Sequence, residues 1–544
     1  MTGNISEVDR KRGQVLDTLK VERDRGITVK AQTASMIYYD NRNKDKSIPY
    51  LINLIDTPGH IDFSYEVSRS LASCQGALLL VDSSQSIQAQ TLANHAKAKK
   101  LGLSIIPVAT KIDLPNAQPE ETALLMGTTF NLDPDTVIMT SAKQNIGIKD
   151  VLEAVIDKLP SPSFNYTTKS NICNTKTPFV GKIVDSWFDE HRGVICLIQA
   201  INGELNETER ISTYASVKES KEIDNRNDFS VQEIGLLTPT PLRTSKLKIG
   251  QVGYVVCGMR STRQARVGDT IYIPQQWNKP EEITPLDGYE AAKPMLFASV
   301  FPANSEELEQ LFSSVDRLCL NDSSISVVKD QSTSLGAGLR CGFLGFLHME
   351  VFNQRLNDEF NIQTVMTTPS VPYILTDENT GAVTVCSSVT NWPESGRNSR
   401  FIISEPMVKV TLVTPKEFYG HMMDIIKERR GSDVEAIYLD DGQVLLNSII
   451  PWQEVVCDMH DEVKNASSGY ASFNYEEAEY RQSDLVKVEI AVNGEACTHS
   501  LTHSLTHSLT HSLTHSLTHS LTHSLTHSFT HSLTHLLTHL LTHR

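Results

Sequence analysis

The sequence of 544 residues lacks the features of several protein classes. Its 49 basic residues are outnumbered by 65 acidic ones, and the net charge of −16 argues against a generally basic nucleic-acid binder, although local basic patches stay open. No apolar run approaches the roughly 20 residues that a membrane-spanning helix needs. Nine cysteines without a paired framework or a C-x-x-C indicate a reducing compartment and no structural zinc. Residues 1–12 form neither a signal peptide nor a clear transit peptide.

The first 160 residues predict an α/β domain. Short apolar runs, typical of buried strands, alternate here with helical segments. The strands are expected at 51–55, 77–82, 104–108 and 137–140, and the helices at 64–74, 86–100 and 148–159. This alternation indicates a parallel sheet with helices on both faces, whose strands point their carboxyl ends at one crevice.

The sequence Asp56-Thr57-Pro58-Gly59-His60 follows the first of these strands. An Asp at the carboxyl end of a buried strand is where α/β proteins place metal and phosphate ligands. After the Pro-Gly turn, the N–H of Gly59 can approach a phosphate with no side chain in the way. His60 is placed to orient an attacking water. Taken alone, the segment also fits an ordinary strand-to-loop turn with a solvated histidine.

Thr28 is a second candidate at this crevice. The charged segment from Asp17 to Arg25 is expected to begin as a helix that Gly26 breaks, which leaves Thr28 in a loop. A flexible loop with a hydroxyl and a backbone N–H can close on Mg²⁺ and a terminal phosphate. Thr28 and Asp56 are therefore the candidate metal ligands. The alternative for Thr28 is a β-branched residue that starts a strand.

Two further loops predict a base-binding site. Thr110-Lys111-Ile112-Asp113 follows the strand at 104–108, and Ser141-Ala142-Lys143 follows the strand at 137–140. The Asp113 carboxylate can accept from the ring N–H and the exocyclic amine of guanine, an adjacent donor pair that adenine lacks. Lys111 could lay its aliphatic stem over the base, and Ser141-Ala142 could donate a backbone N–H to the guanine carbonyl oxygen. In isolation, the first loop would also fit a helix-capping segment.

The chain beyond this domain divides into smaller units. A linker rich in Ser, Thr, Asn and Pro covers 161–177, and short β-rich runs over 178–290 predict a β-barrel. A strand–helix–strand–strand–helix–strand order then occurs twice, over 291–375 and 400–494, and predicts two ferredoxin-like α+β domains. The second is expected to end with a strand at 485–491. Lys427, Arg429 and Arg430 at a helix end fit either an RNA contact or cations favoured near a helix C-terminus. The glycine loop at 335–340 fits a structural hairpin.

A Thr-His-Ser-Leu repeat forms the tail, residues 498–544, and holds twelve of the eighteen histidines. A tetranucleotide satellite, ACTC, would encode this repeat without selection on the peptide. A histidine-rich metal-binding tail is the alternative, and binding of nickel or copper in vitro is expected in either case. Without a periodic apolar face or good helix formers, the tail is expected to be disordered.

Several segments together resemble known families. The four loops of the first domain, with Glu22–Thr28 among them, are similar to the translational GTPases of the elongation-factor class. Three longer motifs, Asp185–Asp189, Arg340–Glu350 and Ser468–Phe473, resemble the LepA type, also called elongation factor 4, and Pro369–Tyr373 is similar to its mitochondrial Guf-type relatives. The resemblance runs from about Gln14 to Gly494.

The resemblance implies a ribosome-dependent GTPase that binds GTP or GDP with Mg²⁺ and supports translation fidelity or back-translocation. Its partners would be ribosomal RNA and ribosomal proteins. It also implies a mitochondrial location, on the matrix side of the inner membrane, with peripheral membrane association. Thr28 and Asp56 would then lie around Mg²⁺, Gly59 would sense the terminal phosphate, and His60 would position the water.

The sequence departs from this family in three places. No G-x-x-x-x-G-K-[ST] occurs, so the first domain is an incomplete P-loop-type GTPase domain, and residues 1–544 are expected to bind GTP weakly and not to hydrolyse it. Thr110 stands where the family usually has Asn. Rho-type GTPases also have Thr at this place. The family's own C-terminal domain is absent and the tail follows in its place, which would weaken contact with RNA.

Three functions are compatible with these residues. The first is a LepA-type translation GTPase, the second a non-catalytic ribosome-binding protein, and the third a fragment without an independent role. A transcript with an in-frame phosphate loop upstream of Met1 would favour the enzyme.

Overall fold

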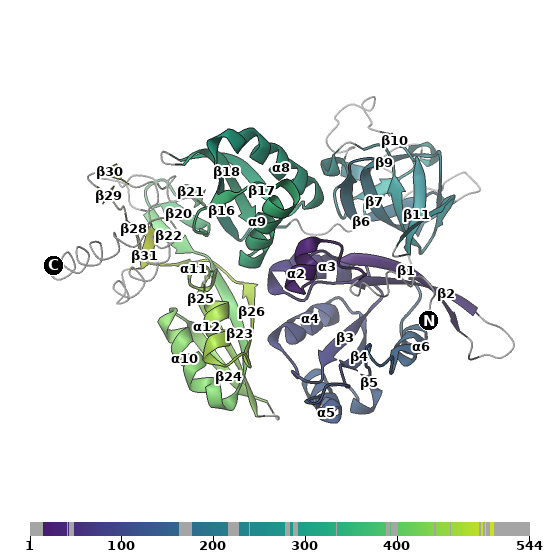
Figure 1. Ribbon diagram of the computed structural model, residues 1–544, viewed down its shortest axis with the longest axis horizontal. Coiled ribbons are helices and arrows are strands. Elements are labelled where there is room, and N and C mark those ends of the chain that lie inside the picture. The colour runs from purple at the N-terminus through teal and green to yellow at the C-terminus, as the bar shows by residue number, and fades with distance from the viewer. Residues whose placement is uncertain are drawn as a thin grey trace.

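The computed structural model arranges the chain as four compact units and smaller sheets (Figure 1). The description covers residues 15–40, 42, 48–162, 177–215, 228–238, 240–259, 261–277, 283–286, 292–332, 335–387, 392, 401–439, 442–456, 458–488, 491–492, 495–496 and 501–504. Most of the predicted linker and most of the predicted disordered tail lie outside these residues.

The first unit alternates strands and helices, as its sequence predicts. Its elements are α2 (Lys20–Arg25), β1 (Gln32–Asp40), β2 (Ile48–Asp56), η1 (Ile61–Phe63), α3 (Ser64–Leu71), β3 (Gly76–Asp82), α4 (Ala89–Lys100), β4 (Ser104–Thr110), α5 (Pro119–Phe130), η2 (Pro134–Thr136), β5 (Ile138–Met139) and α6 (Ile148–Lys158). Strands β3, β4 and β5 form a parallel sheet. Helix α5 was not among the predicted elements, and Gly26 ends α2 in the left-handed conformation, as expected.

The expected single parallel sheet is divided in two. Strand β2 pairs only with β1, antiparallel, and among the described residues neither strand joins the sheet of β3, β4 and β5. Two leucines in these strands are exposed, Leu54 at 36% and Leu80 at 57%. Burial of leucine side chains stabilises a sheet, but no layer covers Leu54 of β2 or Leu80 of β3 among the described residues. The prediction that the Asp56 strand pairs within the parallel sheet is therefore wrong for the described residues.

The second unit is an antiparallel β structure. Its eight-stranded sheet has the order β10-β9-β15-β6-β7-β14-β11-β12, and β8 pairs with β13. The strands are β6 (Val180–Asp189), β7 (Gly193–Asn202), β8 (Glu204–Asn206), β9 (Arg210–Thr213), β10 (Phe229–Ser230), β11 (Glu233–Thr238), β12 (Thr240–Thr244), β13 (Lys246–Lys248), β14 (Val252–Val256) and β15 (Thr270–Tyr272). Alternate side chains, such as Ile183, Cys196 and Ile271, fill one buried core.

The third unit has the strand order expected of a ferredoxin-like domain. Its sheet runs β17-β18-β16-β19, and its helices are α8 and α9. The elements are β16 (Leu296–Pro302), α8 (Leu308–Asn321), β17 (Ser326–Ser332), β18 (Gly336–Phe343), α9 (Phe346–Phe360) and β19 (Thr364–Met366). The glycine loop at 335–340 lies at the start of β18, which pairs antiparallel with β17, so its placement fits a structural hairpin.

The fourth unit repeats this order as β24-β25-β23-β26. Its elements are β23 (Met407–Pro415), α10 (Tyr419–Glu428), β24 (Ser432–Tyr438), β25 (Gln443–Pro451), α11 (Trp452–Val456), α12 (Met459–Ala466) and β26 (Ser472–Glu477). The predicted last strand, at 485–491, is wrong, because β26 pairs with β23 instead. Buried side chains of the third and fourth units form one continuous cluster.

Smaller sheets follow these units. One four-stranded sheet, not predicted from the sequence, contains β20 (Tyr373–Asp377), β21 (Val383–Cys386), β22 (Phe401–Glu405) and β27 (Arg481–Gln482). Strand β28 (Leu485–Val488) pairs with β31 (Leu501–Ser504), and β29 (Ala491–Val492) pairs with β30 (Glu495–Ala496). Residues 501–504 of the expected disordered tail are thus in a strand. No helix among the described residues is long and apolar enough to cross a membrane.

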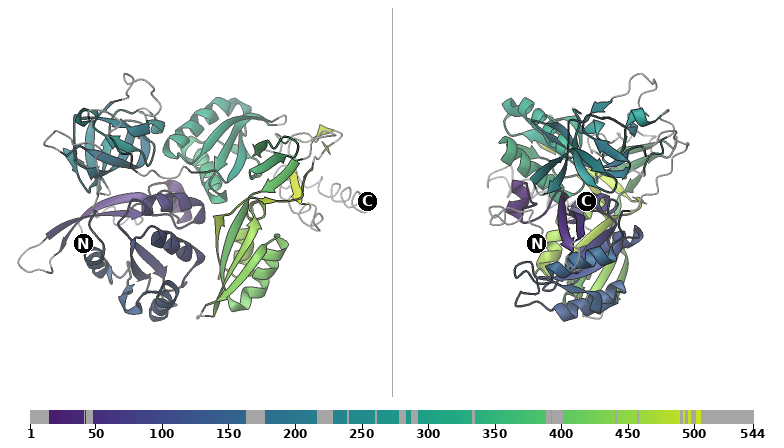
Figure 2. Two further views of the ribbon diagram at one scale, coloured as in Figure 1. Left: turned by 180° about the vertical axis from the view of Figure 1, so that it is seen from behind. Right: turned by 90° about the vertical axis from the view of Figure 1, so that its right-hand side faces the viewer.

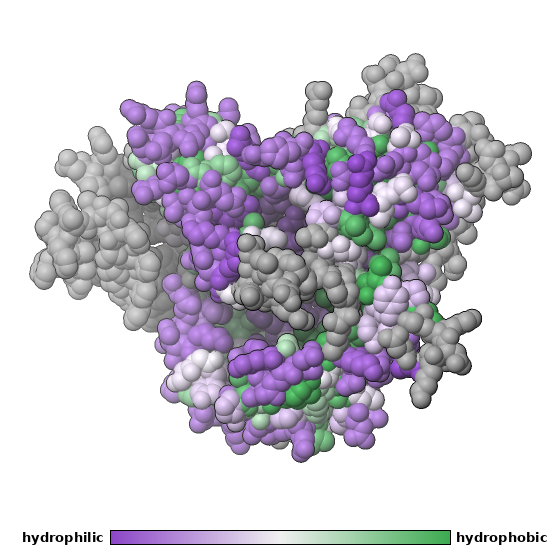
Figure 3. Space-filling model, turned by 45° about the vertical axis from the view of Figure 1, so that its right-hand side comes forward, coloured by the Kyte–Doolittle hydropathy of each residue, from purple (hydrophilic) through white to green (hydrophobic). Residues whose placement is uncertain are grey.

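The units meet around the first one. Strands β1 and β2 and helices α2 and α3 lie between the β unit and the third unit on one side and the β3–β5 layer on the other (Figures 1 and 2). Helix α2 contacts α9, and α4 contacts β26. The face shown in Figure 3 is mostly hydrophilic, with smaller hydrophobic areas. The loops predicted to carry chemistry therefore lie in the unit that contacts each of the other three.

Candidate functional site

The two predicted base-binding loops meet at the ends of β4 and β5. The hydroxyl of Ser141 donates to Asp113 Oδ1 at 2.7 Å, and Ser141 is fully buried. The N–H of Ile112 donates to the carbonyl of Thr140 at 3.3 Å, which holds the first loop to the end of β5. Ala142 and Lys143 are exposed. The parallel pairing of β4 with β5 thus brings together two loops that are 28 residues apart.

The remaining residues of the first base loop anchor it to β3. The hydroxyl of Thr110 donates to the carbonyl of Val81 at 3.2 Å. Lys111 adopts a left-handed backbone, φ 56°, and its Nζ lies 2.8 Å from Asp82 Oδ2. Burial raises the pKa of Asp82, but hydrogen bonds from Lys111 and Ser84 outweigh it, so the pKa lies below its usual value.

Asp113 has one carboxylate oxygen that is available to a ligand. Its Oδ1 accepts from Ser141, and its Oδ2 accepts from no group among the described residues. A carboxylate has lone pairs for further donors, so both donors of a guanine edge fit this group. The serine bond fixes the direction in which the carboxylate points.

The loop that contains Thr28 is anchored by two acidic side chains. The hydroxyl of Thr28 donates to Asp17 Oδ1 at 3.1 Å. The fully buried carboxylate of Glu22 accepts the N–H groups of Leu19, Val29 and Lys30 at 2.9, 3.1 and 3.2 Å. Three charge-assisted bonds of this kind hold the backbone on both sides of Thr28.

Asp56, at the end of β2, belongs to the same acidic group. Burial, followed by the charges of Asp17 and Glu22, raises the pKa of Asp56. A cation there would offset this repulsion, and Mg²⁺ commonly takes one or two protein ligands with phosphate and water oxygens. The Thr28 hydroxyl and the Asp56 carboxylate suit such a site. No three His, Cys, Asp or Glu side chains of the described residues gather as a metal cluster.

The turn after Asp56 leaves a glycine accessible. Pro58 is buried, whereas Gly59 is exposed and a Cβ built on it would meet no atom within 4 Å. Thr57, which connects the end of β2 to Pro58, is half-buried. The backbone of Gly59 therefore faces open space, as approach to a phosphate requires.

His60 faces the fourth unit. Its Nδ1 accepts the N–H of Asp62 at 3.2 Å, and its ring centroid lies 6.2 Å from that of His460. Burial, and to a smaller extent His460, lower the pKa of His60 while the charge of Asp62 raises it, with a net decrease. Since Nδ1 accepts a hydrogen bond, the neutral ring carries its proton on Nε2.

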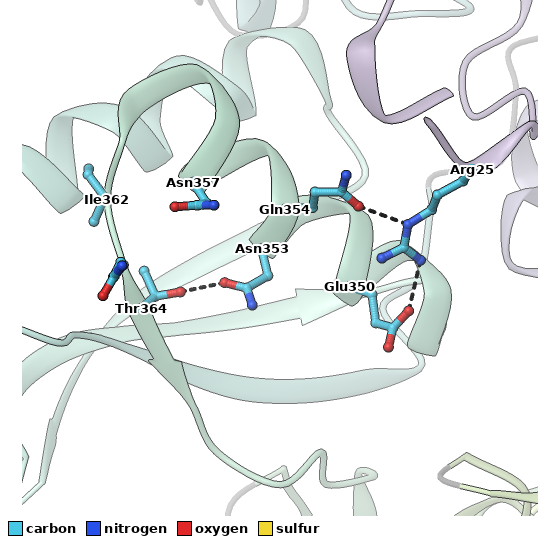
Figure 4. Close-up of a pocket in the computed structure, with 8 residues that line it drawn as sticks. Arg25, Glu350, Asn353, Gln354, Asn357, Ile362 and Thr364 are labelled. Atoms are coloured by element: carbon cyan, nitrogen blue, oxygen red, sulfur yellow. Dashed lines mark hydrogen bonds and ion pairs between the residues drawn. The ribbon is translucent and has the colours of Figure 1, made fainter. Parts of the chain in front are cut away.

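The predicted residues form two groups in the structure. Thr28 and Asp56 lie close to Asp17, while Thr110, Lys111, Asp113 and Ser141 cluster at β4 and β5. Among the described residues, no hydrogen bond or ion pair joins the two groups. A separate pocket of about 540 Å³ lies beside α9, lined by Arg25, Glu350, Asn353, Gln354, Asn357, Ile362, Gln363 and Thr364 (Figure 4). It contains none of the predicted nucleotide residues.

Arg25 at this pocket joins α2 to α9. Its Nη1 lies 2.9 Å from Glu350 Oε2, and its Nε donates to Gln354 at 2.9 Å (Figure 4). Lys20 adds an ion pair of 2.9 Å with Asp358. The segment that leads to Thr28 is thereby docked on the third unit.

Four residues of these networks were not predicted from the sequence: Asp17, Glu22, Asp62 and Asp82. Asp62 accepts hydrogen bonds from groups 285 and 413 residues away, so local patterns gave little signal for it. Glu22 lies in a motif that was recognised, but its role as an anchor of the Thr28 loop was not.

Two of the three basic residues considered for RNA contact, Arg429 and Arg430, form ion pairs within the chain, whereas Lys427 is exposed. Arg430 forms an ion pair with Glu405 at 2.9 Å and another with Glu454 at 3.0 Å. Arg429 forms one with Glu462 at 2.5 Å. These pairs favour a structural role for both arginines.

Comparisons with known proteins match two parts of the chain to known domains. Residues 1–161 match the elongation factor Tu GTP binding domain, and residues 402–491 match the elongation factor G C-terminus. A crystal structure of a Thermus thermophilus protein has a TM-score of 0.55 at 14% identity, covering 87% of this chain and 92% of its own, which supports the fold alone.

Curated relatives are similar over most of the chain. The translation factor GUF1 homolog, mitochondrial, of Phytophthora infestans (strain T30-4) is 43% identical over 494 residues, which are 91% of this chain and 72% of the relative. The Arabidopsis thaliana homolog is 42% identical over 496 residues, 91% of this chain and 71% of the relative. Translation factor GUF1, mitochondrial, of Bos taurus is 41% identical over 503 residues, 91% and 70%.

Proposed function

The chain belongs to the GUF1, or LepA-type, family of translation GTPase factors, and we propose which of its residues carry out that function. The family binds guanine nucleotide, hydrolyses GTP and works with the ribosome. The sequence identity of this chain to the curated relatives favours GTP hydrolysis on the ribosome over a non-catalytic ribosome-binding role. The proposals below concern the roles of single residues.

Asp113 selects guanine in this proposal. Its Oδ2 is available to the ring N–H and the exocyclic amine, while the Ser141 hydroxyl holds Oδ1 at 2.7 Å. This contact is the observation that carries the proposal. Lys111 covers one face of the base with its stem, because its Nζ is tied to Asp82. The exposed backbone at Ala142 and Lys143 donates toward the guanine carbonyl oxygen.

Thr28 and Asp56 would hold Mg²⁺. When bound there, the ion would supply positive charge that stabilises the phosphate oxygens. Asp56 supplies a carboxylate and Thr28 a hydroxyl, while Asp17 and Glu22 add negative charge nearby. Gly59 offers its N–H to the terminal phosphate from a backbone with free space around it.

His60 orients the attacking water in this proposal. As a neutral ring with its proton on Nε2, it can donate one hydrogen bond to the water oxygen and hold it in place. A lowered pKa keeps the ring neutral at physiological pH. Burial of the ring against the fourth unit limits the positions that it can take.

The partners and location follow from the family. The relatives are named as mitochondrial translation factors, and the location of this chain is mitochondrial. We place its action on the matrix side of the inner membrane, with peripheral membrane association, as finer proposals. Fractionation of mitochondria with washes of increasing salt would test the membrane association.

The test of guanine selection is nucleotide binding by matched variants. Asp113→Ala removes the acceptor of two guanine donors, and each charge-assisted bond contributes roughly 1.5–3 kcal/mol. GDP affinity should fall at least about tenfold, at 1.4 kcal/mol per decade, while ADP affinity stays unchanged. Asp133→Asn, an exposed capping position of η2, is the control and should bind as the parent does. Equal GDP and ADP affinity in the parent chain would refute the proposal.

A second experiment measures the binding of the 544-residue chain to mitochondrial ribosomes by pelleting, with and without GTP. Nucleotide titration of the same chain measures whether it binds GDP weakly, as the sequence analysis expects. Micromolar GDP affinity would contradict that expectation. Ribosome binding that needs no nucleotide would support a non-catalytic component of its action.

A further inference from the structure

One acidic side chain of the first unit contacts both ferredoxin-like units. Asp62 lies in η1, two residues after His60, and is 5% exposed. Its Oδ2 accepts the N–H of Leu347 at 2.6 Å and of His348 at 3.4 Å, in the first turn of α9. Its Oδ1 accepts the hydroxyl of Tyr475, in β26, at 2.8 Å. One carboxylate thus joins segments that are 285 and 413 residues from it in sequence.

Helix α9 has a start that fits this carboxylate. Its N-cap residue, Gly345, has no side chain to cap the helix, so Asp62 satisfies N–H groups that a helix start leaves unpaired. A Cβ on Gly345 would lie 2.2 Å from Cγ of Asp62, far inside contact distance. Glycine at this position is therefore needed for the approach. The positive end of the helix dipole adds to the attraction.

The turn around the α9 start is held by a second pair. His348 Nδ1 accepts the N–H of Leu344 at 3.1 Å, and its Nε2 lies 2.9 Å from Asp322 Oδ2. His348 is 3% exposed, so this pair is buried on the histidine side. The N–H groups that meet Asp62 thus belong to a turn with a fixed shape.

His60 is coupled to Asp62 through the main chain and through space. The N–H of Asp62 donates to His60 Nδ1, and Asp62 Oδ1 lies 3.6 Å from the same nitrogen. Phe63, the next residue, is buried with Val21 and Val351, so the segment is also fixed on its other side. A shift of the Asp62 main chain therefore moves the donor that holds His60 Nδ1, and a shift of the carboxylate changes the charge beside the ring.

We propose that Asp62 is a positioning residue that makes the orientation of His60 depend on the docking of α9 and β26. Its consequence for hydrolysis rests on the proposed role of His60, whereas the coupling between the three segments does not. Movement of either ferredoxin-like unit, as on binding a large partner, would shift Asp62 and with it the ring. The conformation of the loop that contains His60 would then depend on the positions of the two ferredoxin-like units, although no ligand contacts all three.

Hydrogen exchange of the 544-residue chain, without nucleotide, tests the coupling. Loss of a helix-capping contact costs enough to speed exchange about 5- to 30-fold. Asp62→Ala should therefore speed exchange in the 345–350 peptide and in the 472–477 peptide, not only around residue 62. Tyr475→Phe, which removes one hydroxyl and keeps the ring, should speed exchange around residues 58–64. Glu350→Gln, which breaks the Arg25 ion pair on the same helix, is the control and should leave residues 58–64 unchanged.

Titration of His60 by NMR, with labelled histidine, adds a signature that a merely structural role would not give. The charged groups that face the ring are Asp62 and His460, with Asp461 beside the latter. Asp62→Asn removes the charge that raises the pKa of His60, so that pKa should fall below its value in the parent chain. His60→Gln assigns the signal. The pKa should not change in Glu350→Gln.

Exchange that spreads to both ferredoxin-like units together with a lower His60 pKa would support the assignment. Exchange confined to residues 58–64 in Asp62→Ala, or an unchanged His60 pKa in Asp62→Asn, would overturn it. Since neither measurement uses nucleotide, a failure of the proposed function appears separately, as GDP binding that Asp113→Ala does not weaken.

Discussion

The ion-pair cluster around Arg430 allows a quantitative prediction. Arg430 lies two residues after the end of α10 and has a left-handed backbone, φ 57°. Its guanidinium donates to both carboxylate oxygens of Glu405, at 3.0 and 2.9 Å. The Glu405 side chain is 3% exposed, while that of Arg430 is 22% exposed. Glu405 also accepts the hydroxyl of Ser483. Nearly all of its charge compensation therefore comes from one arginine.

Arg430→Met should be strongly destabilising. It keeps most of the apolar stem but leaves the Glu405 carboxylate buried without its partner, which costs about 3–5 kcal/mol in comparable pairs. The double variant Arg430→Met/Glu405→Gln should recover most of this loss, because no unpaired charge stays buried. Arg429→Met is the matched control and should cost about 1 kcal/mol, since its partner Glu462 is 37% exposed and can be hydrated.

Hydrogen exchange in β23 and β25 measures the effect, because both strands belong to the sheet that α10 covers. A loss of about 3 kcal/mol should speed their exchange roughly 100-fold at 1.4 kcal/mol per decade. Equal effects of Arg430→Met and Arg429→Met would refute the reasoning from burial. Ribosome binding that falls in Arg430→Met without any change in exchange would instead favour a direct RNA contact by this arginine.

Three more predictions concern other parts of the chain. Burial raises the pKa of Asp56, so its ionised form is disfavoured in the folded state, and Asp56→Asn should slightly raise the stability at pH 7 without Mg²⁺. For the same reason, the Mg²⁺ affinity of the parent chain should begin to fall at a pH above the usual Asp pKa of about 3.9. Thermal melts and Mg²⁺ titrations at pH 7.5 and 5 check the two signs. Leu446→Ala, at a fully buried position of β25, should cost about 2–5 kcal/mol in urea unfolding, and a cost below that of an exposed control, Leu242→Ala, would contradict the assigned core. Deletion of residues 505–544 should abolish retention on a nickel column and leave ribosome binding unchanged, since retention that persists would place metal binding outside the tail.

Local patterns predicted the elements whose stabilising contacts are close in sequence. The apolar stripe of α6 and the apolar run of β2 are each visible within one short segment of the sequence. The guanine loops were also predicted, because two short motifs at the ends of neighbouring strands converge in any parallel sheet. Their roles remain predictions, although the structure joins Asp113 to Ser141.

Elements whose stability comes from another unit were not predicted. In strand β26 only Phe473 and Tyr475 are aromatic or apolar, and the polar Ser472 and Asn474 that alternate with them are buried as well. Its hydroxyl groups are satisfied across a domain boundary: Ser472 accepts the N–H of Ala89 at 2.9 Å, and Tyr475 donates to Asp62. The more apolar segment at 485–491 therefore looked like the better last strand. The apolar character of this segment carried no information about whether it pairs with a strand of the four-stranded sheet.

The three motifs that resemble the LepA type lie where the units meet. In Asp185–Asp189, Asp185 pairs with Lys30 and Arg69 of the first unit, at 3.3 Å each. Arg340–Glu350 presents the start of α9 to Asp62, and Ser468–Phe473 leads into β26, which presents Tyr475 to the same carboxylate. A motif that served catalysis alone would lie at the nucleotide loops, and a motif that served folding alone would fill a core. Motifs placed instead on three contacts with the first unit are what a factor needs if the docking of its other units is to control the loop that contains His60.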